Sequence, residues 1–60
     1  MTHQEQVSAL KLRIARSELQ RDAWRAAGRE EKYLEAYFMV EALELQLAAR
    51  VARSDIDNSS

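Results

Sequence analysis

Gly28 is the only glycine in a chain of 60 residues that contains no proline, and it lies close to the midpoint. Glycine is common directly after a helix because it adopts the left-handed backbone conformation without steric cost. On both sides of it, apolar residues recur at the three- and four-residue spacing of a helix. The sequence therefore predicts an all-α chain, an antiparallel hairpin of two helices over about 3–27 and 29–53.

The residues near the predicted helix ends agree with these bounds. Thr2 followed by Glu5 fits a capping box, in which a hydroxyl and a carboxylate satisfy backbone donors that are free at a helix start. Glu30 and Glu31 fall in the first turn of the second helix and Arg50 falls near its end, which is the order that the helix dipole favours. We expect two helices of similar length that pair along their whole extent.

The predicted hairpin domain covers 1–53, and 54–60, which lacks apolar periodicity, is predicted to be a disordered tail. A core in a chain this small rarely supplies more than about 3–5 kcal/mol of stability. The chain has no cysteine, so no disulfide can add to that. We therefore expect further stability from self-association or from a protein partner.

Each predicted helix carries two apolar stripes on nearly opposite sides, at about 100° per residue. On the first helix, the Val7 stripe comprises Val7, Leu10, Ile14 and Trp24, and the Leu12 stripe comprises Leu12, Ala15, Leu19, Ala23 and Ala26. On the second helix, the Tyr33 stripe comprises Tyr33, Ala36, Val40, Leu43, Leu47 and Val51, and the Leu34 stripe comprises Leu34, Phe38, Leu45, Ala48 and Ala52.

A lone hairpin covers only one stripe of each helix and leaves the other in water as an apolar patch that monomers seldom tolerate. The pattern predicts that the hairpin completes a four-helix bundle or a coiled coil, either with a second copy or with another protein. It leaves open which stripe faces outward. A homodimeric structural hairpin with no further ligand remains an alternative.

The residue types that carry catalysis or bind metals are sparse. His3 is the only histidine and there is no cysteine, so a His-Cys nucleophile pair cannot form within the chain. Glu41 and Glu44 lie close together on the second helix, but no Glu-x-x-His pattern accompanies them. We expect no enzyme activity, no cofactor, no metal and no small-molecule substrate.

Charge and hydropathy narrow the partners further. The net charge of −1 supplies no general attraction to nucleic acid or to anionic lipid. Arg13 and Arg16 are the candidate RNA contacts, but no aromatic residues are interleaved with them as in single-strand binders. The apolar run Ala36–Val40 is too short to span a bilayer, and the polar first residues show no secretory signal. Together with the lack of cysteine, this predicts a cytoplasmic protein that binds protein.

A longer pattern spans residues 9–52, with apolar residues in the first helix, an Arg before a glycine-containing turn, an aromatic after it, and an Ala-Leu-Glu run followed by aliphatics. Its positions are Leu12, Ile14, Ala15, Leu19, Arg25, Gly28, Tyr33, Ala42, Leu43, Glu44 and Leu47. This pattern resembles the small E-type co-chaperones of type III secretion needle subunits, although Phe38-Met39-Val40 is more apolar than that family's polar stretch. The resemblance implies a non-catalytic hairpin that docks onto a tetratricopeptide-like co-chaperone and keeps a needle subunit unpolymerised.

The first helix also resembles the Rop family of plasmid copy control, through Met1-Thr2, Gln4-Glu5, Arg13 and Arg16-Ser17. That resemblance implies a homodimeric four-helix bundle that binds paired RNA loops. The family's RNA-facing positions would fall at His3, Leu10, Ile14, Glu18 and Arg25. Leu10 and Glu18 do not suit phosphate contact, and the second helix shows no match. The co-chaperone is the favoured prediction, and the Rop-like protein is the alternative.

Overall fold

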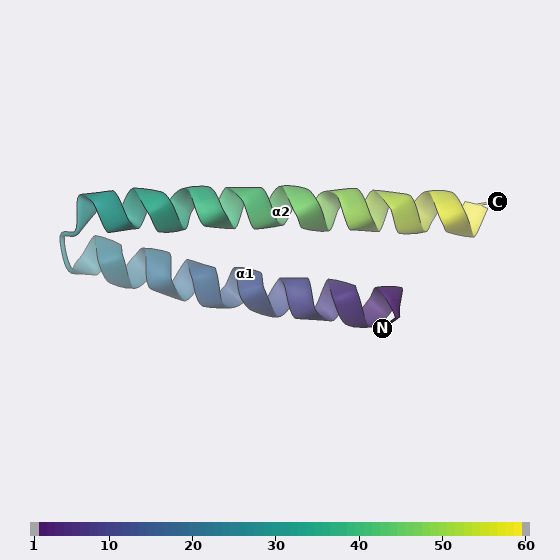
Figure 1. Ribbon diagram of the computed structural model, residues 1–60, viewed down its shortest axis with the longest axis horizontal. Coiled ribbons are helices and arrows are strands. Elements are labelled where there is room, and N and C mark those ends of the chain that lie inside the picture. The colour runs from purple at the N-terminus through teal and green to yellow at the C-terminus, as the bar shows by residue number, and fades with distance from the viewer. Residues whose placement is uncertain (1, 60) are drawn as a thin grey trace.

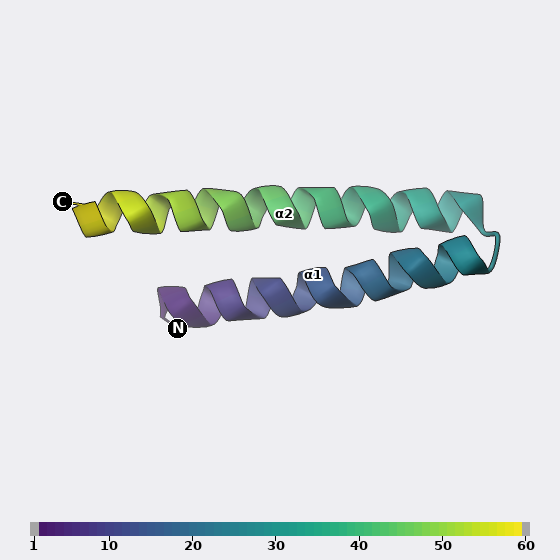
Figure 2. The ribbon, with the colours of Figure 1, turned by 180° about the vertical axis from the view of Figure 1, so that it is seen from behind.

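The computed structural model describes residues 2–59, with side chains described as far as residue 53. Helix α1 runs from His3 to Ala26 and helix α2 from Glu30 to Ser59. The two helices lie antiparallel in a single layer, joined by a short turn (Figure 1). From behind, no other described segment covers either helix (Figure 2). The predicted all-α two-helix hairpin is confirmed.

The hairpin is long and thin, with extents of 49 × 16 × 13 Å. Its Cα radius of gyration is 14.2 Å, whereas a compact domain of this length has a radius of roughly 10 Å. Its accessible surface is 4908 Å², whereas a folded monomer of 6.9 kDa exposes roughly 4,000 Å². Only the side chains between the two helices can leave water, so most apolar residues outside that seam stay exposed.

Helix α1 begins with the predicted capping box. The Glu5 amide donates to Thr2 Oγ1 at 3.1 Å, and the Thr2 amide donates to Glu5 Oε2 at 3.3 Å. These two bonds satisfy donors that have no partner inside the helix.

The turn is a Schellman motif that follows α1. The Gly28 amide donates to the Arg25 carbonyl at 3.1 Å, and the Arg29 amide donates to the Trp24 carbonyl at 3.0 Å. These are the two bonds that define the motif, and they require a left-handed residue between them. Gly28 supplies it with φ of 72°. The Arg29 carbonyl then accepts from the Tyr33 amide at 2.9 Å, which starts α2.

Helix α2 continues to Ser59, beyond the end predicted near residue 53 and into the segment predicted to be a disordered tail. No glycine or proline follows Gly28, so the sequence contains no residue that forces the helix to stop. Apolar periodicity ends earlier than the helical backbone does. The last turns of α2 therefore extend past the start of α1 (Figure 1). Residue 60 lies outside the described residues.

The core consists of few side chains. Among residues 2–53, the buried residues are Leu10 and Ile14 from α1 and Val40 and Leu43 from α2, with exposed fractions of 1–8%. Leu47 packs against the cluster that Leu10, Ile14 and Leu43 form. Because the core is one side chain deep, each of these residues carries a large share of the stability.

We expect Gly28→Ala to destabilise the hairpin by about 1–2 kcal/mol, because an L-residue in the left-handed region brings its Cβ too close to the following carbonyl oxygen. No other atom lies within 4 Å of the added Cβ, so the cost comes from the backbone alone. Urea denaturation followed by circular dichroism measures it. Gly28→Asn is the matched control and loses less, because Asn tolerates this conformation. Equal stability of the Ala and Asn variants would contradict the assignment.

Leu43 and Leu45 form a matched pair for testing the core, because they are the same residue type two positions apart, with exposed fractions of 2% and 72%. Leu43→Ala is expected to cost about 2–5 kcal/mol, which is enough to unfold a core of this size. Leu45→Ala is expected to change stability by less than about 0.5 kcal/mol. Thermal melts of both variants, run at one concentration, measure the difference. Similar melting temperatures for the two would show that the seam is misassigned.

Candidate protein-interaction surface

The seam between the helices is formed by the Val7 stripe and the Tyr33 stripe. All but one of their members are buried or half-buried. The buried and half-buried members are Val7, Leu10, Ile14, Trp24, Tyr33, Ala36, Val40, Leu43 and Leu47. The exception is Val51, which is 44% exposed. It lies one residue beyond Arg50, whose side chain contacts Gln6 near the start of α1, so little of α1 remains to cover it. The structure thus shows which stripes face inward, which the sequence pattern left open.

The Leu12 stripe and the Leu34 stripe face water. Their members are all exposed: Leu12, Ala15, Leu19, Ala23, Ala26, Leu34, Phe38, Leu45, Ala48 and Ala52. The exposed fractions of Leu19, Phe38 and Leu45 are 71%, 64% and 72%. The Leu12 stripe lies about half a turn around α1 from the seam, and the Leu34 stripe lies more than a third of a turn around α2 from it. The two stripes therefore lie on the outer sides of the two helices, toward opposite edges of the layer.

The two helices differ in charge. The α1 sequence contains five basic and three acidic residues, a net charge of +2. The α2 sequence contains three basic and seven acidic residues, a net charge of −4. Arg21 Nε donates to Asp22 Oδ1 at 3.1 Å, and this hydrogen bond raises the pKa of the guanidinium above its usual value. The chain as a whole is nearly neutral, so composition alone does not reveal the acidic helix.

Aromatic rings connect the seam to the Leu34 stripe. The ring centroids of Tyr33 and Tyr37 are 6.1 Å apart, and the Tyr37 and Phe38 rings meet edge to face at 5.7 Å. Such pairs are favourable beyond the area that they bury. The exposed Phe38 ring therefore has a neighbour that restricts its orientation.

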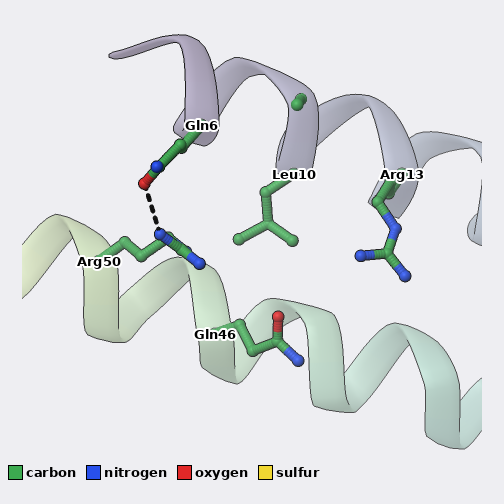
Figure 3. Close-up of a pocket in the computed structure, with 6 residues that line it drawn as sticks. Gln6, Leu10, Arg13, Gln46 and Arg50 are labelled. Carbon is green, nitrogen blue, oxygen red and sulfur yellow. Dashed lines mark hydrogen bonds between the residues drawn. The ribbon is translucent and has the colours of Figure 1, made fainter. Parts of the chain in front are cut away.

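The open end of the hairpin has a groove between the helices that is lined by both polar and apolar side chains (Figure 3). Gln6, Ala9, Leu10 and Arg13 line it from α1, and Gln46 and Arg50 line it from α2. An Arg50 guanidinium nitrogen donates to Gln6 Oε1 at 2.8 Å (Figure 3). Arg13 and Arg50 lie at opposite ends of this groove, with Leu10 and Gln46 between them (Figure 3). Arg13 and Arg16 are both exposed, and Arg16 does not line the groove.

The turn end has a cation-π contact that the sequence reasoning missed. The Arg29 guanidinium carbon lies 5.9 Å from the centroid of the Trp24 ring. Trp24 and Arg29 are the two positions of the Schellman motif whose side chains usually make an apolar contact. Here an arginine over an aromatic face takes that role. The spacing of an aromatic four residues before the glycine and a basic residue directly after it is the signal that identifies the pair.

Among the side chains that the structure describes, residues 2–53, no group of three His, Cys, Asp or Glu is arranged to hold a metal ion. Within the same part of the chain, neither helix has a stretch long and apolar enough to cross a membrane. Comparison with models of known protein families, with curated proteins and with solved structures finds no match. The resemblances to the E-type co-chaperones and to the Rop family therefore stay predictions.

Arg29→Ala is expected to destabilise the hairpin by about 0.5–1 kcal/mol, because it removes the cation-π contact at the turn. Trp24 is the only tryptophan in the chain, so its fluorescence reports the change directly. We expect a shift in the Trp24 emission and a lower urea midpoint. Arg53→Ala, an exposed arginine at the other end of α2, serves as the control. An unchanged emission spectrum in Arg29→Ala would contradict the contact.

Proposed function

We propose that this chain is a non-enzymatic, cytoplasmic protein-interaction module whose exposed apolar edges are covered by helices of a partner. The observation that carries the proposal is the exposure of Leu19, Phe38 and Leu45, each more than three-fifths accessible to water. Phe38 and Leu45 lie on one face of α2, and Leu19 lies on α1. Large apolar side chains exposed in this way mark a protein contact, because burying each of them is worth about 1.5–3 kcal/mol. Because the core is small and supplies little stability by itself, such a contact would also stabilise the folded hairpin.

The resemblance to the E-type co-chaperones supplies a specific partner within this class. In this proposal, the hairpin docks onto a tetratricopeptide-like co-chaperone, and the pair keeps a type III secretion needle subunit from polymerising in the cytoplasm. The exposed edges support it, because helical repeat proteins offer extended concave surfaces that accept a helix.

Co-expression with the tetratricopeptide-type chaperone and the needle subunit of the same organism tests this function. We expect one soluble complex that contains all three chains and a needle subunit that no longer sediments as a polymer. The double variant Phe38→Ser with Leu45→Ser should no longer join the complex, because both side chains lie on the exposed Leu34 stripe. A needle subunit that sediments equally with and without the hairpin would overturn the co-chaperone function.

Sedimentation equilibrium of the hairpin alone tests the broader class. Association that strengthens with concentration and disappears in the Ser variant would identify the homodimeric alternative. A hairpin that stays monomeric, and that also joins no complex with the two secretion proteins, would contradict the interaction module itself.

A further inference from the structure

We infer that the Leu34 stripe docks an amphipathic helix whose own apolar stripe is flanked by Lys and Arg. This inference rests on the proposed interaction function and goes beyond it, because it names which edge binds and the chemistry of what it binds. Three features of α2 carry it: the spacing of the exposed apolar residues, the charge around them, and the contact of the Phe38 ring with Tyr37.

The spacing suits a helix that lies along α2. Leu34, Phe38 and Leu45 fall on one side of α2 at intervals of four and seven residues, which is the repeat of a coiled-coil seam. Ala48 and Ala52 continue the same repeat with small side chains that permit close approach of a second backbone. The Leu34 stripe therefore extends over most of the length along which α2 is paired with α1.

Along the middle of the Leu34 stripe, the charged residues have one sign. From Tyr33 to Ala49, α2 contains no Lys or Arg, whereas Glu35, Glu41 and Glu44 are exposed. Glu41 lies within the repeat, between Phe38 and Leu45. Among the described residues, Glu35 pairs with Lys32 at 3.7 Å, and no ion pair involves Glu41 or Glu44. A helix with Lys or Arg beside its apolar stripe would place opposite charges against these carboxylates.

The same carboxylates disfavour the other occupants of this edge. A second copy docked through its own Leu34 stripe would bring the Glu41 and Glu44 side chains of the two chains together, which costs energy. Nucleic acid and anionic membranes carry phosphates that this edge repels. The Leu12 stripe of a second copy has the acidic Glu5 and Asp22 as well as the basic Arg16 on its side of α1, so the charge beside it is mixed.

The Phe38 ring gives the edge an anchor. Its edge-to-face contact with Tyr37, which in turn contacts Tyr33 at the seam, limits the orientations of the ring before a partner arrives. Less side-chain entropy is then lost on binding. Large aromatic anchors near the middle of an interface carry much of the binding energy.

Two synthetic peptides test the inference on the full chain. Both are helices of heptad repeats with Leu at the seam positions, and they differ only in having Lys or Glu at the flanking positions, so each repels itself. Fluorescence anisotropy of the labelled peptides, titrated with the hairpin, gives the dissociation constants. We expect the Lys peptide to bind at least about tenfold more tightly than the Glu peptide, with an affinity that falls as salt is raised.

Two matched variants locate the site. Phe38→Ser and Leu19→Ser each remove one exposed apolar side chain, from opposite edges, and neither side chain belongs to the core. Phe38→Ser should raise the dissociation constant for the Lys peptide by about tenfold or more. Leu19→Ser should bind this peptide with the affinity of the wild type. The double variant Glu41→Lys with Glu44→Lys should reverse the preference between the two peptides. Circular dichroism confirms that each variant is folded.

Equal affinity for the two peptides would overturn the inference and leave the interaction module standing, because the stripe would then bind without regard to charge. An equal loss in Leu19→Ser would overturn the choice of edge. Self-association of the wild type that Phe38→Ser abolishes would assign the edge to a second copy instead. Failure of both peptides to bind would also overturn the inference, whereas the proposed function fails only if the partner complex is absent as well.

Discussion

The packing of the Val7 stripe against the Tyr33 stripe is the contact on which the rest of the hairpin depends. Among the described side chains, this contact is where residues from both helices leave water together, and Leu10, Ile14 and Leu43 form its centre. Neither helix has a second neighbour, so every residue that this contact does not use is placed outward by default. The surface offered to a partner is therefore determined by which side chains fill the seam.

The turn and this seam reinforce each other. The Schellman bonds fix the direction in which the chain leaves α1, and a left-handed glycine makes that direction accessible at no steric cost. The rotation of α2 about its own axis follows from where it begins, at Glu30. A helix that began one residue later would be rotated by about 100° and would present a different side to α1. The backbone conformation of the turn therefore determines which residues face each other far along both helices.

Most of the fold could be read from the sequence, because its signals are local. Gly28 and the capping box of Thr2 with Glu5 determine the backbone only within a few residues along the chain, and both occur where the sequence predicts them. The end of α2 could not be read in this way. The loss of apolar periodicity after residue 53 removes a reason to pack, but it does not stop a helix, and no breaking residue is present to do so.

The candidate surface was only half predictable. Both stripes on each helix were visible, but their apolar content is too similar to rank them, since Leu10 and Ile14 on one side of α1 are balanced by Leu12 and Leu19 on the other. The choice depends on complementary packing across the seam, which no single helix encodes. Contacts such as Arg50 with Gln6 join residues far apart in sequence, so they appear only once the two helices are paired.

A layer one helix thick and two helices wide also separates its two edges. Substitutions more than about 7–10 Å apart usually have additive effects, and the full width of both helices lies between the exposed leucines of α1 and those of α2. One edge can therefore change in sequence, or be covered, without altering the other. This separation gives a chain of 60 residues two surfaces on which selection can act independently.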